Sequence, residues 1–313
     1  MFALRPFPDV PTHRYKIYGL SIVSDLRLPE LPEDEGDGEA DVRISGAVVA
    51  GSEEGISFGP DGAVLHIKGI ASYLIRDGRG ILVDPAPDAV ERNVRLYLLG
   101  SAFGILLHQR VLLPLHANAI EIDGHAVAFM GETGAGKSTL AAWLHDAGHR
   151  VIADDVCVLD FGEGGQDRIR VRPGMPRIRL WKDALERSGR VSADYEFSYA
   201  GDESYEKFDV PVSPERSTET DLDLVAIYVL STGESFDISR LSGVDAADAV
   251  FSNTYRGFVL SELGQSRLHF DAALKVVRST PIFRLERSRR LEDIAGDVSR
   301  VIAHARSLVE PAC

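Results

Sequence analysis

The chain has 313 residues, 44% hydrophobic and 26% charged, and its 34 basic against 48 acidic residues give a net charge of −14. This length suits one large domain or two modest ones, and it excludes a disulfide-stapled mini-protein or a disordered tail. The negative charge disfavours non-specific binding to nucleic acids and anionic membranes, so we expect neither as a partner.

Signals for export and for disulfide bonding are missing from the sequence. Residues 1–7 lack the apolar core of a signal peptide, and no window approaches the roughly 18 uninterrupted apolar residues of a membrane span. The two cysteines, Cys157 and Cys313, are too few for a disulfide framework or a zinc site. We therefore predict a cytoplasmic protein.

The first part of the chain has the pattern of a β-rich domain. Short apolar runs separated by turn residues predict strands, and the acidic, glycine-rich residues 32–39 predict a loop. The apolar spacing over residues 89–110 predicts a long amphipathic helix. We place an N-terminal β-rich domain with this linking helix at residues 1–104. The predicted strands cover residues 17–23, 40–44, 63–67, 72–75 and 81–83.

The pattern then becomes that of an α/β domain, which we place at residues 105–313. Residues 117–122 and 125–130 predict a hairpin, because the intervening Asp123-Gly124 suits the positive φ angles of a tight turn. The later predictions are a helix at 138–147, one buried strand over 151–159 that two aspartates interrupt, a helix at 178–185, a mobile loop at 188–204, a strand at 222–230, and helices at 245–252, 265–277 and 291–308.

A phosphate-binding loop follows the hairpin. The chain matches the Walker A pattern G-x-x-x-x-G-K-[ST] with Gly131, Glu132, Thr133, Gly134, Ala135, Gly136, Lys137 and Ser138, and Thr139 comes next. The loop amides and the helix N-terminus favour phosphate, Lys137 is expected at the outer phosphates, and Ser138 is expected to ligate Mg²⁺. We predict that ATP and Mg²⁺ bind here. The chain has no Asn-Lys-x-Asp guanine-reading motif, which favours ATP over GTP.

Acidic residues follow the loop at a short distance. Asp154 and Asp155 interrupt an apolar strand, and Asp155 comes 18 residues after Lys137, which leaves room for one helix, one turn and one strand. If the two strands are neighbours, both carboxylates lie beside the phosphates, where one can hold the metal and one can accept a proton. His116 lies just before the hairpin, and on composition alone a lone histidine is more often a core or surface group.

These residues, in this order and at this spacing, resemble the catalytic domain of the HPr kinase/phosphorylase family. The resemblance rests on Leu115-His116, on residues 131–139 and on residues 148–155. It is tight over residues 116–155 and absent from the first hundred. That profile is similar to the smaller HPr-kinase-like proteins, among them kinases that phosphorylate a serine of lasso-peptide precursors.

The resemblance implies a role for each matching residue. Asp155 would be the general base that takes the proton of a serine hydroxyl, and Lys137 would hold the transferred phosphate. Ser138 and Asp154 would organise Mg²⁺, and His116 would lie near the γ-phosphate. The family's metal-binding glutamate has no counterpart in residues 172–181 and its dephosphorylation loop is not matched, which argues against phosphorylase activity and against HPr as the substrate.

Three basic residues remain open between a functional and a structural role. Arg177, Arg179 and Lys207 can supply positive charge over the phosphates or the substrate, and they can equally be solvated surface charges.

The predicted function is that of an ATP-dependent serine kinase acting on a peptide or small protein. A kinase of a small hydroxylated metabolite and a nucleotide-dependent regulatory binding protein are the alternatives. A general base at Asp155 favours transfer, because a binding protein needs no group to deprotonate a hydroxyl. The sequence leaves the acceptor and the oligomeric state open.

Overall fold

The computed structural model describes residues 12–50, 53–162, 168–202, 204–288 and 290–309, so the features noted at residues 1–7 and at Cys313 lie outside it. The described chain divides into two units. Unit 1 extends to Leu112 and also contains Ser198–Tyr205 and Arg256–Ser266, and unit 2 contains the remaining described residues. The assignment of residues 1–104 and 105–313 to separate functional domains stays a prediction.

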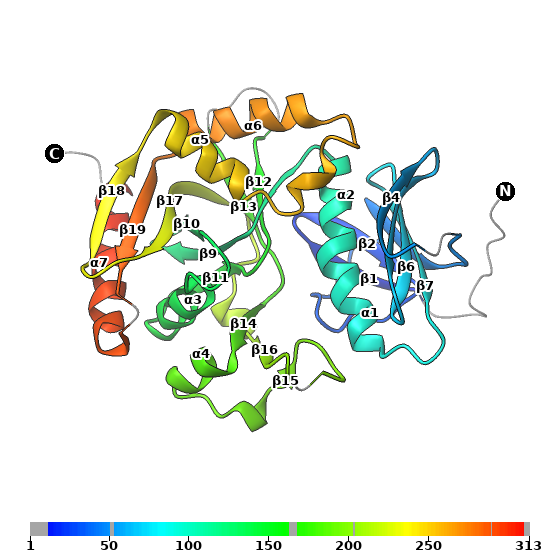
Figure 1. The fold of residues 1–313 in the computed structure, drawn as a ribbon, viewed down its shortest axis with the longest axis horizontal. Helices are drawn as coiled ribbons and strands as arrows, with labels where there is room; N and C mark the ends of the chain where they lie inside the picture. Colours follow the sequence, from blue (N-terminus) through cyan, green and yellow to red (C-terminus); the bar gives the residue numbers. More distant parts are fainter. Residues whose placement is uncertain (1–11, 51–52, 163–167, 203, 289, 310–313) are drawn as a thin grey trace. The chain divides into compact units, whose positions relative to one another are not determined.

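Unit 1 is built on a seven-stranded sheet with the order β1-β2-β3-β7-β6-β5-β4 (Figure 1). The predicted single run 17–23 is wrong, because a turn with positive φ at Tyr18 and Gly19 divides it into two strands. Two strands were not predicted: β1, which the predicted run meets only at Ile17, and β4, where only Ile56 and Phe58 carry the alternation between flanking glycines. The strands are β1 (His13–Ile17), β2 (Leu20–Ser24), β3 (Val42–Gly46), β4 (Gly55–Gly59), β5 (Gly62–Ile67), β6 (Ala71–Arg76) and β7 (Gly80–Pro85).

The predicted long helix of this region is confirmed. It consists of α1 (Glu91–Tyr97), a π-helical turn η1 (Leu98–Ala102) and α2 (Phe103–Gln109), which follow one another without a gap. The helix packs on the sheet of unit 1: the Tyr73 hydroxyl donates a hydrogen bond of 2.8 Å to the Val94 carbonyl.

In the main sheet of unit 2, the strand β10, which leads into the phosphate-binding loop, lies between its hairpin partner β9 and the parallel strand β17 from later in the chain. The sheet has nine strands in the order β11-β9-β10-β17-β13-β12-β8, with β19, followed by β18, branching from β17. β10, β17 and β19 are parallel, and β9 is antiparallel to both β10 and β11. The predicted hairpin is confirmed, with φ of 48° at Asp123 and 80° at Gly124. The strands are β9 (Ala117–Ile122), β10 (His125–Met130), β11 (Arg150–Ala153), β17 (Leu222–Thr232), β18 (Asp237–Leu241) and β19 (Ile282–Arg287).

One end of the nine-stranded sheet is formed by β13, β12 and β8. The first residues of β17 pair with β13, β13 pairs with β12, and β12 pairs with β8. A separate three-stranded sheet of unit 2 has the order β14-β16-β15. These strands are β8 (Leu113–Leu115), β12 (Cys157–Asp160), β13 (Arg170–Arg172), β14 (Arg177–Trp181), β15 (Glu196–Phe197) and β16 (Lys207–Pro211).

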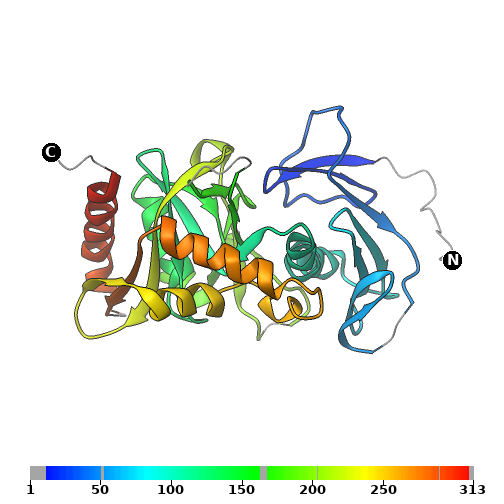
Figure 2. The same ribbon diagram turned by 90° about the horizontal axis from the view of Figure 1, so that it is seen from above.

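Helices cover both faces of the main sheet (Figures 1 and 2). α3 (Lys137–Asp146) and α7 (Leu291–Val309) pack on the face to which Val127 and Phe129 point. α5 (Gly243–Ser252) and α6 (Ser266–Ser279) pack on the face of Ala126, Ala128 and Met130. β10 is therefore buried on both sides, as a central parallel strand requires. The predicted helices 138–147, 245–252, 265–277 and 291–308 and the strand 222–230 are confirmed.

Two sequence predictions in unit 2 are wrong. Residues 151–159 are not one strand: β11 pairs with β9, whereas β12 pairs with β8 and β13, because the chain turns at Asp155, whose φ is 70°. Residues 178–185 are not one helix either. Ile178 and Leu180 alternate with arginines at the strand period of two and form β14, and the helix α4 (Lys182–Arg187) begins only after it.

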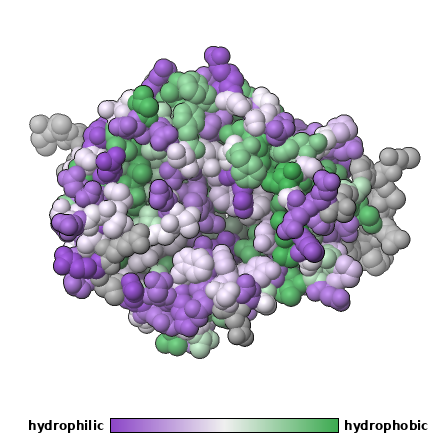
Figure 3. All heavy atoms as spheres, in the orientation of Figure 1, coloured by the Kyte–Doolittle hydropathy of each residue, from purple (hydrophilic) through white to green (hydrophobic). Residues whose placement is uncertain are grey.

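Hydrophilic side chains gather over α4 at the bottom of Figure 3, where Asp183, Glu186 and Arg187 are exposed. The mobility predicted for residues 188–204 stays a prediction, and the described part of that range contains η2 (Ser192–Asp194) and β15. Within the described ranges, no helix is both long and apolar enough to cross a membrane.

Candidate functional site

The phosphate-binding loop connects β10 to α3 and depends on glycine at two close approaches. Gly131 has a φ of 141°, and a Cβ there would lie 2.8 Å from the Leu230 carbonyl oxygen. Gly136 has a φ of 90°, and a Cβ there would lie 2.5 Å from Nη2 of Arg287. A side chain at either position would strain the backbone, and at Gly131 it would also clash with a backbone oxygen that cannot move aside, so both positions favour glycine.

Lys137 reaches back over the loop. Its buried ammonium donates hydrogen bonds to the carbonyl oxygens of Gly131 (2.8 Å) and Glu132 (3.2 Å). Burial lowers the pKa of Lys137, and the charge of Asp155 opposes that shift. The ammonium is therefore poorly hydrated, and an anion beside it gains strongly from its charge.

Asn253, the residue that follows α5, joins the loop to His116. Its Oδ1 accepts a hydrogen bond of 2.9 Å from the Gly131 amide, and its backbone oxygen accepts one of 2.7 Å from the His116 amide. Its own Nδ2 donates to the Ala249 carbonyl. Asn253 was not predicted from the sequence, because it lies more than a hundred residues from the loop and belongs to no motif.

Asp154 is a buried carboxylate surrounded by hydrogen-bond donors. Asn118 Nδ2 donates to its Oδ1, Ser138 Oγ lies 3.4 Å from the same atom, and the Arg179 amide donates to Oδ2 at 2.8 Å. Burial, followed by the charge of Asp155, raises the pKa of Asp154 to about 6. A nearby cation would favour the charged form of such a carboxylate.

The residues around Asp154 fit a magnesium ion. Asn118 Oδ1 is buried and has no hydrogen-bond partner among the described residues, so an oxygen of the kind that Mg²⁺ prefers is left unsatisfied beside Ser138 and Asp154. The described ranges contain no group of three or more His, Cys, Asp or Glu that could hold a metal. Magnesium at phosphate sites usually takes only one or two carboxylates, with water and phosphate oxygens as its other ligands.

Asp155 meets a different set of neighbours from Asp154. Its Oδ2 lies 3.3 Å from Arg179 Nη1, and its Oδ1 lies 3.6 Å from His116 Nδ1. Burial alone would raise the pKa of Asp155, but the positive charges of Lys207 and Arg179 outweigh it and hold the pKa at about 2. The left-handed turn at Asp155 thus sends two adjacent carboxylates into environments that push their pKa values apart.

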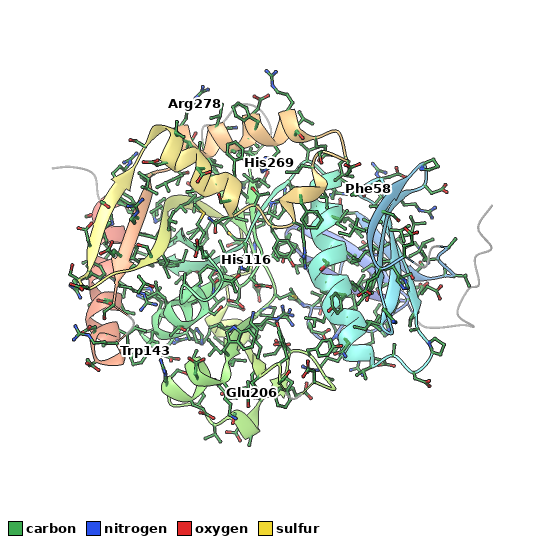
Figure 4. All side chains as sticks on the ribbon, viewed as in Figure 1. Phe58, His116, Trp143, Glu206, His269 and Arg278 are labelled. Atoms are coloured by element: carbon green, nitrogen blue, oxygen red, sulfur yellow. The ribbon has the colours of Figure 1, made fainter. Side chains whose placement is uncertain are left out.

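His116 supports that turn (labelled in Figure 4). Its Nδ1 donates a hydrogen bond of 3.0 Å to the Asp155 carbonyl oxygen, which assigns the ring proton to Nδ1. Burial lowers the pKa of His116, so the ring is neutral at pH 7 and Nε2 is left as an acceptor. The prediction that His116 belongs to the site agrees with this placement, while its exact role stays a prediction.

The three basic residues singled out in the sequence all lie near the carboxylates. Arg177 and Arg179 share one face of β14, and both pair with Asp209 on β16, at 3.0 Å and 3.3 Å. Lys207 also lies on β16, and its charge lowers the pKa of Asp155. Arg179 is only 8% exposed, so it is no solvated surface charge. Asp209, which organises the two arginines, was not predicted.

The structure therefore gathers the predicted catalytic and metal-binding residues in unit 2, just before β9, directly after β11, and on β14, β16 and α3. Thr139 lies in the first turn of α3, and the side chains of Glu132 and Thr133 are exposed on the loop. The gathered residues are His116, Lys137, Ser138, Asp154, Asp155, Arg177, Arg179 and Lys207.

Comparison with known proteins bears on this arrangement. No family model matches the chain. Over 58 residues the chain is 34% identical to an HPr kinase/phosphorylase of Caldanaerobacter subterraneus subsp. tengcongensis. Over this stretch the chain resembles HPr kinases. That HPr-kinase-like stretch is 18% of this chain and 18% of the relative, so the chain spans less than a fifth of the length of the protein it matches.

One solved structure is also similar. The Hpr(Ser) kinase/phosphatase from Coxiella burnetii aligns with 63% of this chain and 99% of its own, at 13% identity and a TM-score of 0.35. The resemblance to HPr kinases predicted from the sequence is confirmed by the 58-residue match, and the predicted α/β fold class by the strands and helices of unit 2. The narrower resemblance to lasso-peptide precursor kinases stays a prediction.

Proposed function

We propose that the chain is an ATP- and Mg²⁺-dependent kinase that transfers the γ-phosphate to a serine hydroxyl of a peptide or small protein. The observation that carries this proposal is the pair of adjacent carboxylates beside the phosphate-binding loop, one in contact with Ser138 and the other paired with Arg179. A site that only bound nucleotide would need the first carboxylate and have no use for the second.

The donor would bind through the loop amides and Lys137. Ser138 and Asp154 would hold Mg²⁺, and the ion would neutralise charge on the phosphates when bound. Lys137 would exchange its hydrogen bonds to the loop carbonyls for phosphate oxygens.

Transfer would use Asp155 as the proton acceptor. The serine oxygen forms a bond to the γ-phosphorus while the bond from that phosphorus to the β–γ bridging oxygen breaks, and the serine proton moves to the Asp155 carboxylate. With a pKa of about 2, free Asp155 is a weak base. The negative γ-phosphate offsets the charges of Lys207 and Arg179, so donor binding raises the pKa of Asp155 towards that of a useful acceptor.

His116 and Arg179 would act on Asp155 by holding it in place. His116 fixes the backbone of the left-handed turn, and Arg179 fixes the carboxylate through Oδ2. A dissociative transition state demands mainly positioning and charge neutralisation, which matches this division of roles. A peptide serine is the proposed acceptor because the relative is named for action on the protein HPr and the matched motifs resemble those of peptide serine kinases.

The proposal is tested by intact-mass measurement of peptides and small proteins encoded beside the gene, after incubation with ATP and Mg²⁺. We expect a gain of about 80 Da, one phosphoryl group, on a serine. Asp155→Asn should keep its affinity for ATP and lose transfer, and Lys137→Ala should lose both.

The other outcomes are equally informative. Transfer by Asp155→Asn at the parent rate would refute the base assignment. ATP hydrolysis stimulated by a metabolite pool, without any peptide adduct, would identify a small-molecule kinase. Nucleotide binding with neither signal would identify a regulatory binding protein.

A further inference from the structure

A cavity of about 540 Å³ lies beside the phosphate-binding loop, and none of the predicted catalytic residues lines it. We call it the α5 cavity, because one wall is the helix α5. Its lining includes Glu132 and Thr133 from the loop, Leu230 and Ser231 from the end of β17, and Asp245 and Asp248 from α5. Its volume is in the range of sites that bind small molecules and cofactors.

The strand order shows which part of the donor the cavity can receive. Asp154 and Asp155 follow β11, which lies beyond β9 on one side of the loop strand β10. The α5 cavity adjoins the end of β17, the neighbour of β10 on the opposite side. A nucleotide whose γ-phosphate points toward the carboxylates therefore extends its other end toward β17 and the cavity.

The charges that line the cavity disfavour a negatively charged ligand. Three of its lining side chains are acidic, Glu132, Asp245 and Asp248, and one is basic, Arg284. Neither Asp245 nor Asp248 forms a hydrogen bond or an ion pair with any described residue, and both are exposed. Free carboxylates of this kind accept hydrogen bonds from neutral donors such as hydroxyl and amino groups, and they repel phosphate.

The rest of the wall suits a flat, partly apolar group. Val229, Leu230 and Ala249 give it an apolar surface. The Ser231 hydroxyl is buried in the same wall and has no hydrogen-bond partner among the described residues. A ligand with one apolar face and several hydrogen-bonding edges would satisfy this combination.

We infer that the α5 cavity binds the nucleoside half of the phosphate donor, with the ribose hydroxyls donating to Asp245 and Asp248 and the base lying on the apolar wall. This inference rests on the proposed kinase function and deepens it, because it assigns a binding site for the nucleoside of the donor in addition to the site for its phosphates. It also implies that ATP is the donor in place of a bare polyphosphate.

Calorimetric titration with Mg²⁺-ATP and with Mg²⁺-tripolyphosphate, which carries three phosphates and no nucleoside, tests this inference. We expect the wild type to bind ATP at least about tenfold more tightly than tripolyphosphate. Asp248→Ala, and the double variant with Asp245→Ala, should weaken ATP binding about tenfold and leave tripolyphosphate binding unchanged. Asp237→Ala on β18 is the matched control, because it removes an exposed carboxylate outside the cavity.

Two results would overturn the inference: equal affinity of the wild type for the two ligands, or a double variant that binds ATP as tightly as the wild type does. Both are distinguishable from failure of the proposed function, since Lys137→Ala would then still weaken tripolyphosphate binding. If Lys137→Ala binds tripolyphosphate normally, the phosphate site itself is misassigned. Asp248→Ala alone keeps the test valid if the double variant unfolds, because Asp248 lies in the middle of α5 and outside its first turn.

Discussion

Replacement of Asn118 by leucine tests whether the ionised form of Asp154 depends on its neighbours. Asn118 Nδ2 donates to Asp154 Oδ1, and leucine has a similar size and no donor. A hydrogen bond to a charged group contributes about 1.5–3 kcal/mol, and about 1.4 kcal/mol corresponds to one pKa unit. Loss of the bond favours the protonated form, so Asn118→Leu should raise the pKa of Asp154 from about 6 to about 7–8.

The consequence should be a pH-dependent requirement for magnesium. With a pKa near 7.5, about a tenth of the Asp154 side chains are ionised at pH 6.5 and about nine tenths at pH 8.5. The apparent Kd for Mg²⁺ in the variant should therefore change about tenfold between these pH values, and that of the wild type less than about twofold. The assay is a Mg²⁺ titration of initial phosphotransfer rate at saturating ATP, with each variant rate divided by that of the wild type.

Asn93→Leu is the matched control, because Asn93 is another buried asparagine whose hydrogen bonds go to the backbone of Ala200 in unit 1. It should leave the pH dependence of the magnesium requirement unchanged. If Asn118→Leu follows the wild type at both pH values, then either the Asn118 amide does not stabilise the carboxylate or Asp154 does not hold the metal.

Three further predictions concern single side chains. Asp154→Asn should abolish transfer and raise Tm at pH 7. A buried acid whose pKa is raised from 3.8 to about 6 destabilises the fold above that pH, by at most about 3 kcal/mol, and asparagine removes this cost. An unchanged or lower Tm would contradict this prediction. His116→Ala should lower kcat more than tenfold at an unchanged KM for ATP, and normal turnover would return His116 to a structural role. Gly131→Ala should lower Tm more than Gly134→Ala, because both have positive φ but only Gly131 lies against a backbone oxygen, that of Leu230; equal losses in thermal scans would refute the steric argument.

Local patterns in the sequence predicted the elements that local chemistry determines. The Asp123-Gly124 turn, the loop ending at Lys137 and the amphipathic helix from Glu91 to Gln109 depend on residues that are close together in the chain. Each has a physical reason that a short window contains: positive φ, converging amides or a 3.6-residue period.

The missed features depend on contacts between distant segments. Asn118 sits in a strand pattern in which an asparagine carries no motif, and only the fold places it against Asp154, 36 residues later. Asp209 and Asn253 reach the site from β16 and from the end of α5. The turn at Asp155 was not predicted either, because the apolar residues on both sides of it have the pattern of one strand, and only the structure shows that they pair with different strands.

The order of strands in the main sheet has a consequence for how such a protein can diverge. The carboxylates follow β11, on one side of the loop strand, and contact Arg179 of β14, whereas β17, β19 and the α5 cavity lie on the other side. Because substitutions far apart in a structure act almost independently, one half can be altered while the other is preserved. For the proposed kinase, this means that the specificity for the hydroxyl acceptor can change during evolution while the binding of the phosphate donor is kept.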